Sequence, residues 1–547
     1  AKGRRFTRRL ENSYRLTSVV LGTGATGPVR LAMGQGARSD HRFAVKTLRL
    51  AELSATTRVQ FETEVEIFLS IDHPHIARLV DVFETREHLH LVMECMDGGE
   101  LFDRLIEVGT FAERNAAATI RQMLLALKYL HAVGFVHRDL KPENVLYEAK
   151  DSDHLQLIDF GFSKSLDLSP GIHEQSGSLR YAAPEVLDRR LQPLHQHGMD
   201  FSSCDMWSLG VIAFLLLSGY MPFAGTDPHM VAASIKLGAF KWRPERWQRV
   251  SQDARHFMRS LLVVDPSQRL TAHAALDHRW IAEMTQSIKK VDVDASVVEG
   301  FRQFSRASKF RRACMSMMAW SLTKEDRAVV DEHFFQIGKS QEGTITLSEL
   351  EQVMKAKLQA TGEEIRQTFA ALVTNHDERI HYSDFLAAMV ASQIALHDHT
   401  IQDAFNRFDT DSSGYITVGN LQEVFGGSAD HLEVQQFIAE ADFYHDGQIS
   451  YSEFVRYVQG DTAEGVAAIG KSMGAAAAAS AVAGRLLKGL AVGCVGARFG
   501  SNAAGNRYTP HIGAVGSCHS AFGFVSRVVQ HSRSGTWPRS CVVARCL

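Results

Sequence analysis

His137-Arg138-Asp139-Leu140-Lys141-Pro142-Glu143-Asn144 is the stretch that decides how this chain of 547 residues is interpreted. Asp139 is a carboxylate that can orient and deprotonate an attacking hydroxyl group. Asn144, further along the same loop, offers an amide oxygen to a magnesium ion, and Lys141 can contact a phosphate as a point charge. These residue types suit phosphoryl transfer to a hydroxyl. They predict catalytic roles for Asp139, Lys141 and Asn144.

Upstream, Leu21-Gly22-Thr23-Gly24-Ala25-Thr26-Gly27-Pro28-Val29 contains three glycines whose backbone amides could approach phosphates closely. In a Rossmann fold a helix would follow such glycines. Here the apolar stretch Phe43-Ala44-Val45-Lys46 follows, which predicts strand, turn and strand. An unpaired ammonium group in an apolar strand would be costly, so Lys46 needs an anionic partner.

Glu64 is the candidate partner of Lys46. Residues 56–71 have helical periodicity, and Glu64 lies on the apolar face of the expected helix. A carboxylate on that face needs a cation, so we predict a Glu64–Lys46 pair and count both residues as catalytic. A solvated helix charge is the alternative, because Glu62 and Glu66 lie close by in the sequence.

Further motifs follow in order, among them Asp159-Phe160-Gly161 and Ala183-Pro184-Glu185. The whole series resembles that of a serine/threonine protein kinase. The resemblance implies an α+β bilobal kinase fold over residues 14–281, with an N-lobe at 14–96 and a C-lobe at 97–281. It implies transfer of the ATP γ-phosphate to protein Ser or Thr hydroxyls. No essential position is substituted, which argues against an inactive kinase.

The resemblance also implies a site for ATP and Mg²⁺. It assigns to the nucleotide Leu21, Gly22, Gly24, Gly27, Val29, Ala44, Lys46, Met93, Glu94, Met96, Glu100, Asn144 and Asp159. Met93 would be the gatekeeper, and the backbone of Glu94 and Met96 would bind adenine. Glu100 would reach the ribose or a basic substrate side chain. Asn144 and Asp159 would be the magnesium ligands.

Two ion pairs are predicted around the activation segment. Many kinases are phosphorylated three residues before the position of Gly177, and here that residue is Glu174. We predict that Glu174 pairs with Arg138 and orders the segment without phosphorylation; an exposed loop charge is the alternative. Arg269 is placed to pair with Glu185.

Residues 282–325 form a junction of different character. Residues 301–320 are basic, amphipathic and rich in Phe and Met, which predicts a helix that suits an acidic, Met-lined groove. Such a helix could instead block a substrate cleft, or simply pack. The residues expected to act in regulation are Arg138, Glu174, Phe310, Arg311, Arg312 and Trp320.

A repeat occupies residues 326–460. Asp409-Thr410-Asp411-Ser412-Ser413-Gly414-Tyr415-Ile416 begins like a calcium loop, and a second such loop runs from Asp442 to Glu453. Counting back along the chain finds related stretches at 338–349 and 373–384. Four units predict two EF-hand pairs in an all-α, calmodulin-like domain.

The four loops differ in their ligands. Gly338 and Val373 replace the first carboxylate, and Glu378 replaces the turn glycine of the second loop, so these two loops are expected to be structural. Asn420 weakens the third loop, because it cannot supply a bidentate carboxylate. The fourth loop has Tyr444 at its third position. The predicted Ca²⁺ ligands are Asp409, Asp411, Ser413, Tyr415, Asp442, Asp446, Gln448 and Glu453.

A kinase, a basic junction and four EF-hand units on one chain resemble the calcium-dependent protein kinases of plants and protists. The resemblance implies that the junction blocks the kinase cleft until Ca²⁺ lets the EF-hand domain bind it. It also implies substrates with a basic residue before the phosphoacceptor, read by Glu143 and Glu100. The alternatives are a kinase gated by separate calmodulin and a non-catalytic calcium-responsive scaffold.

Composition bounds the remaining expectations. A net charge of −3, 45% hydrophobic and 22% charged residues are ordinary for a globular protein. Seven cysteines without an even framework favour a cytoplasmic location, and no apolar run is long enough for a transmembrane segment. We expect a monomer without a nucleic-acid partner.

The two ends of the chain are expected to lie outside the fold. Residues 1–13 are basic, and a missing N-terminal extension would allow peripheral membrane association. Residues 461–547 are rich in Ala and Gly, then basic, and we expect this tail to be disordered.

Overall fold

The computed structural model describes residues 5–6, 10–24, 27–36, 39, 41–50, 65, 68–69, 71–85, 87–159, 177–187, 202–285, 292–338, 343–373, 378–390, 392, 397–425 and 430–460. Glu64, Glu174 and the tail 461–547 lie outside these residues, so the predictions made for them stay predictions. None of the helices in this described part combines the length and hydropathy needed to span a bilayer.

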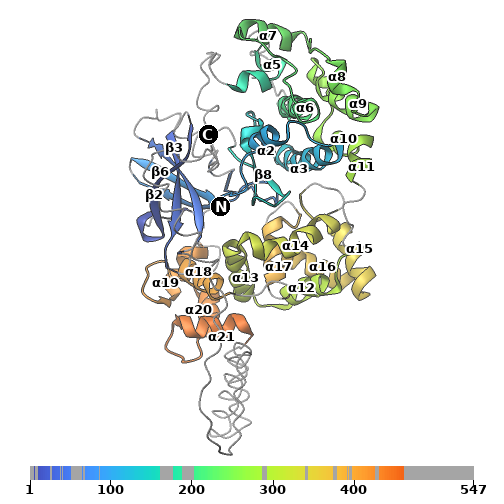
Figure 1. Ribbon diagram of the computed structural model, residues 1–547. Helices are drawn as coiled ribbons and strands as arrows, with labels where there is room; N and C mark the ends of the chain where they lie inside the picture. The colour runs from blue at the N-terminus through green and yellow to red at the C-terminus, as the bar shows by residue number, and fades with distance from the viewer. Residues whose placement is uncertain are drawn as a thin grey trace, which may run out of the picture. The chain divides into compact units, whose positions relative to one another are not determined.

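A six-stranded sheet forms the N-terminal lobe (Figure 1). Its strand order is β1-β5-β6-β4-β3-β2. Its strands are β1 (Arg5–Phe6), β2 (Tyr14–Gly24), β3 (Gly27–Gly34), β4 (Arg42–Arg49), β5 (Leu79–Glu84) and β6 (His88–Glu94). Neighbours are antiparallel except β1 and β5. The glycine-rich stretch is therefore the strand–turn–strand that the sequence predicts. The register places Lys46 on β4 opposite Val29 on β3 and Leu91 on β6.

The expectation that residues 1–13 lie outside the fold is wrong for two short pieces. Arg5–Phe6 pair with β5 as the edge strand of the sheet. Leu10 is 2% exposed and joins a small core with Tyr14 and Phe43. One buried leucine in a basic segment is too little for periodicity to reveal.

Helices dominate the next lobe. Its elements are α2 (Leu101–Val108), α3 (Glu113–Ala132), η5 (Pro142–Asn144), β7 (Val145–Tyr147), β8 (Leu155–Leu157), η6 (Gly177–Tyr181), α5 (Pro184–Leu187), α6 (Ser202–Ser218), α7 (Pro228–Lys236), α8 (Pro244–Trp247), α9 (Gln252–Leu261), η8 (Pro266–Gln268), α10 (Ala272–Leu276) and α11 (Arg279–Thr285). Helix α6 is buried on all sides from Cys204 onward and packs on α3 and α9. A sheet lobe followed by a helical lobe confirms the predicted α+β fold.

The junction, which ends at residue 325, and the EF-hand region follow and form one almost wholly helical part of the chain. Its elements are α12 (Ala295–Arg306), α13 (Lys309–Ser321), α14 (Lys324–Ile337), α15 (Leu347–Leu358), α16 (Gly362–Leu372), α17 (Tyr382–Val390), α18 (Asp398–Phe408), β9 (Tyr415–Ile416), α19 (Val418–Phe425), α20 (His431–Ala441), β10 (Ile449–Ser450) and α21 (Tyr451–Gln459). Residues of α12 and α13 share one hydrophobic core with the other helices of this region.

The prediction of a single helix over residues 301–320 is wrong. The chain leaves the helical conformation at Ala307, and α13 begins afresh after Ser308. The Ser308 hydroxyl accepts a hydrogen bond from the backbone N–H of Arg311 at 3.2 Å. A serine that caps a helix start satisfies an otherwise unpaired amide, and here it separates two helices of similar amphipathic pattern.

Candidate active site and calcium loops

The catalytic loop is fixed from below by Asp205 of α6. Its carboxylate accepts hydrogen bonds from the backbone amides of His137 at 2.9 Å and Arg138 at 2.8 Å, and it lies 2.9 Å from His131 Nε2. Burial alone would raise the pKa of Asp205, but the hydrogen bonds and charge of His131 and the contacts with His137 lower it. The loop backbone is thus held by a buried carboxylate that stays ionised.

Asp139, Lys141 and Asn144 come together as the sequence predicts. Lys141 Nζ lies 2.8 Å from Asp139 Oδ2, and Asn144 Nδ2 donates to the Asp139 carbonyl at 2.8 Å. The other side of the Asn144 amide, Oδ1, is buried and accepts no hydrogen bond from the residues that the structure describes. A buried acceptor without a donor suits a cation ligand, so Asn144 fits a magnesium site.

Lys46 and Asp159 meet across the two lobes. Lys46 Nζ lies 3.3 Å from Asp159 Oδ1, and both side chains are 3% exposed. The pairing of Lys46 with Glu64 is untested, because Glu64 is not described. Asp159 has φ +56° and Arg138 φ +65°, a conformation that non-glycine residues rarely adopt. Strained backbone at both ends of the site is typical of functional positions.

Five of the residues that the resemblance assigns to the nucleotide lie in one buried region. Leu21, Val29, Ala44, Met93 and Met96 belong to the same core cluster, and Ala44 on β4 lies opposite Met93 on β6. Gly22 pairs with Val29 and Gly24 with Gly27 across the β2–β3 turn, where Gly27 has φ +121°. Glu100 is buried at the start of α2.

The pair of Glu185 and Arg269 forms as predicted. Arg269 donates two hydrogen bonds to the Glu185 carboxylate, at 2.7 and 3.1 Å, and its side chain is fully buried. We expect Arg269→Gln to destabilise the helical lobe by about 3–5 kcal/mol, because it leaves a buried carboxylate unpaired. Urea denaturation measures this change. The matched variant Arg279→Gln breaks an exposed pair with Glu283 and is expected to cost about 1 kcal/mol or less. Equal losses in the two variants would contradict this prediction.

The four-unit repeat is visible in the backbone. The sixth loop position has a positive φ in every unit, at Gly343 (+71°), Glu378 (+54°), Gly414 (+86°) and Gly447 (+84°). Ile345 and Ile380 exchange backbone hydrogen bonds of 2.9 and 3.0 Å, and Ile416 pairs with Ile449 in the β9–β10 ladder. The units therefore form two pairs in the predicted register.

The candidate calcium ligands are engaged with their own loops. In the fourth loop Asp442 accepts from the amides of Asp446 and Gly447, and Glu453 accepts from Tyr444 and Ser450. In the described residues no three His, Cys, Asp or Glu side chains are grouped as metal ligands. The oxygen donors of the fourth loop fit Ca²⁺ in kind, and Glu453 would have to exchange its hydrogen bonds for the ion.

The third loop offers a weaker set. Asp409 accepts hydrogen bonds from the amides of Ser413 and Gly414, and Asp411 accepts from the Ser413 amide. Asn420 stands where the bidentate carboxylate belongs and accepts from Thr417 instead. Tyr415 contributes only its backbone to β9. The donors fit Ca²⁺ in part.

Helix α13 packs on α17 of the first EF-hand pair and on α18 and α21 of the last pair, and its first turn contacts the last pair. Phe310 is fully buried, with ring centroids 5.6 Å from Phe437 and 5.4 Å from Tyr457. Arg311 donates to the Val458 carbonyl at 3.2 Å, and burial lowers the pKa of Arg312. The first turn of α13 thus packs among aromatic side chains of the last EF-hand pair.

Comparison with known proteins follows the same division of the chain. Residues 16–281 match the family model of the protein kinase domain, and residues 398–459 match that of the EF-hand domain pair. Calcium-dependent protein kinase 5 of Plasmodium falciparum is 31% identical over 459 residues, covering 82% of this chain and 78% of the relative. Calcium-dependent protein kinase 7 of Arabidopsis thaliana is 34% identical, covering 77% and 78%.

This chain belongs to the calcium-dependent protein kinase family. It is therefore a calcium-regulated serine/threonine protein kinase. A kinase domain implies ATP and protein substrates, and EF-hands imply Ca²⁺.

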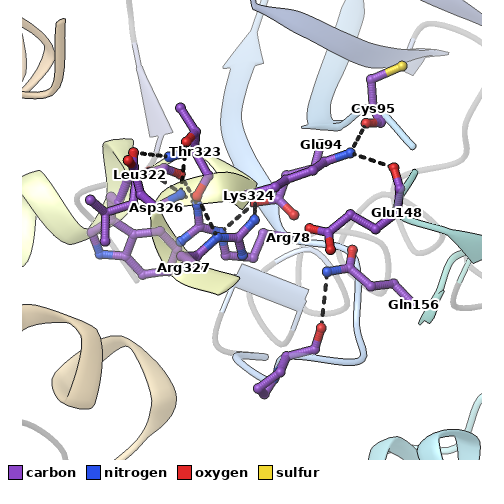
Figure 2. Close-up of polar contacts among 12 residues, drawn as sticks. Arg78, Glu94, Cys95, Glu148, Gln156, Leu322, Thr323, Lys324, Asp326 and Arg327 are labelled. Carbon is purple, nitrogen blue, oxygen red and sulfur yellow. Dashed lines mark hydrogen bonds and ion pairs between the residues drawn. The ribbon is translucent and has the colours of Figure 1, made fainter. Parts of the chain in front are cut away.

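One buried group of this calcium-dependent protein kinase escaped the sequence reasoning. Glu94, at the end of β6, pairs with Arg78 and with Arg327 of α14, each at 2.8 Å (Figure 2). The sequence assigned only the Glu94 backbone a role. These charged residues lie on distant segments and follow no periodic pattern, so the local sequence does not predict that they form ion pairs.

Proposed function

We propose that this kinase phosphorylates serine and threonine hydroxyls of protein substrates and is switched by its own EF-hand region. The observation that supports the catalytic part best is Asn144. Its amide nitrogen is bound to the Asp139 carbonyl, while its buried oxygen has no donor among the described residues. That arrangement suits a loop prepared for a metal–nucleotide complex.

Asp139 would accept the proton of the substrate hydroxyl and orient its oxygen toward the γ-phosphate. Lys141, 2.8 Å from Asp139, would contact the transferred phosphate. Asn144 and Asp159 would hold magnesium, which when bound neutralises phosphate charge. Lys46 would contact the α- and β-phosphates, and Glu64 would fix its ammonium group.

Control would operate through the position of α13. Without Ca²⁺ the basic junction would occlude the kinase cleft, and with Ca²⁺ at the third and fourth loops the EF-hand region would hold it. The burial of Phe310 and the contacts of Arg311 with α21 support this capture. Gating by separate calmodulin is favoured by one observation, the loss of ligands at Gly338 and Val373.

Glu143 is proposed to read a basic residue of the substrate, together with Glu100. Glu143 Oε2 is buried and accepts no hydrogen bond in the described part of the chain. A carboxylate oxygen of this kind pairs well with an arginine side chain.

The test is phosphate transfer from labelled ATP to two serine peptides by the whole chain, with Mg²⁺ and Ca²⁺. One peptide has arginine three residues before the serine, and the other has alanine there. We expect phosphoserine in both and a higher kcat/KM for the arginine peptide, with the difference reduced in Glu143→Gln. Absence of phosphoserine in either peptide would contradict the proposal, and equal kcat/KM values would remove the role of Glu143.

A further inference from the structure

The hinge, residues 94–96 at the end of β6, contacts the start of α14, and this contact removes charged groups from water. The side chains of Arg78, Glu94 and Arg327 are 5%, 8% and 4% exposed. Burying ions is costly unless their geometry is good, and both guanidinium groups reach the same oxygen, Glu94 Oε1. Burial alone would raise the pKa of Glu94, but the charges of Arg327, Arg78 and Lys324 lower it to about 2.

The start of α14 also contacts the backbone of the residue that follows Glu94. Lys324 donates to the carbonyl of Cys95, the next hinge residue, and lies 3.4 Å from the Glu148 carbonyl (Figure 2). Arg78 donates to the carbonyls of Ala319 and Leu322 at 3.4 Å. Its guanidinium lies 5.3 Å from the ring centroid of Trp320. The end of α13 therefore contacts Arg78, and the first turn of α14 contacts Glu94 and the Cys95 carbonyl.

A second group of contacts joins the EF-hand region to the kinase at a separate place, around residues 72–75. Gly343 of the first loop lies so close to the kinase that a Cβ there would stand 2.6 Å from His73 Cδ2. Phe335 of α14 stacks on His75 with centroids 5.2 Å apart. The Ser383 amide donates to the Asp72 carboxylate. The first EF-hand pair, whose two loops have Gly338 and Val373 in place of the first carboxylate, makes these contacts.

We infer that Lys324 and Arg327 are positioning residues for the nucleotide. They fix the hinge through the Glu94 side chain and the Cys95 carbonyl, so seating of the EF-hand region and binding of ATP or ADP strengthen each other. The inference rests on the proposed placement of adenine against the Glu94 and Met96 backbone. Coupling between two binding equilibria is reciprocal, so nucleotide must also stabilise the seated α14.

The effect of Lys324 and Arg327 on nucleotide binding is tested by the ADP affinity of the whole chain in Ca²⁺, measured by titration calorimetry. Coupling free energies of the usual size correspond to a change of at least about fivefold in affinity. We expect this weakening in Arg327→Gln and in Lys324→Met, with a smaller loss in Arg327→Lys. Arg366→Gln on α16, an arginine paired with Glu363, serves as the matched control and should bind ADP as the unchanged chain does.

The reciprocal effect, stabilisation of α14 by nucleotide, is tested by hydrogen exchange of individual amides. ADP should slow exchange in the first turn of α14 in the unchanged chain and lose that effect in Arg327→Gln. If that variant does not fold, Lys324→Met carries the same comparison. A purely structural role would leave α14 indifferent to ADP.

Two outcomes distinguish failure of the coupling from failure of the proposed nucleotide site. Protection of the Met96 amide by ADP, together with unchanged affinity in both variants, would overturn the coupling and keep the proposed nucleotide site. No protection at Met96 would overturn the site itself, and the coupling with it.

Discussion

Asp139→Asn is expected to lower kcat for peptide phosphorylation by about 10²–10⁴-fold, the usual contribution of a positioned general base. Asparagine has nearly the same shape as aspartate but cannot accept the substrate proton. It would also lose the charge that faces Lys141 Nζ at 2.8 Å. Steady-state kinetics with a serine peptide measures the change.

Asp151→Asn is the matched control for Asp139→Asn. Asp151 is exposed in a turn after β7, and its variant should keep the kcat of the unchanged chain. Circular dichroism and the unfolding midpoint should be alike in all three proteins. If Asp139→Asn kept kcat within about threefold, general-base catalysis by this residue would be wrong.

Phe310→Ala is expected to destabilise the EF-hand region by about 3–5 kcal/mol, the range for deleting a buried phenyl ring. The ring is fully buried and contacts aromatic side chains of α18, α20 and α21. The EF-hand region should therefore hold α13 less tightly, and a higher Ca²⁺ concentration should be needed for half-maximal activity. Chemical denaturation and a calcium titration of activity measure the two effects.

Tyr444→Ala is the matched control for Phe310→Ala. Tyr444 is 66% exposed in the fourth loop, so removing its ring should change the free energy of unfolding by about 0.5 kcal/mol or less. An unchanged calcium midpoint in Phe310→Ala, with the expected loss of stability, would show that α13 packs in the core without a role in switching.

The catalytic loop could be predicted because its chemistry is local. Asp139, Lys141 and Asn144 lie within a few residues of each other, and one anchored turn brings them together. The EF-hand register could be predicted because equivalent positions of the four repeat units can be compared with one another. Glu378 takes the positive φ of the turn glycine it replaces, and Ile345 and Ile380 pair as their shared position requires.

The junction and the hinge contact could not be predicted for two different reasons. Residues 301–320 keep an amphipathic pattern across Ser308, so periodicity alone does not reveal that this serine starts a new helix. Arg327 and Glu94 are 233 positions apart, and both read as ordinary charges in their local sequence. Only the fold brings them into one buried cluster.

The most direct test of a self-contained calcium switch is the initial rate of peptide phosphorylation by this chain with Mg²⁺-ATP. The rate is measured in Ca²⁺ and in chelator, without calmodulin. We predict a rate that rises with Ca²⁺ and a rise that is lost in Glu453→Gln, where the last loop loses the carboxylate of its final position. Tyr444→Ala should keep the rise. Equal rates in Ca²⁺ and chelator would contradict a self-contained calcium switch, and a rise only after calmodulin is added would assign the switch to a separate protein.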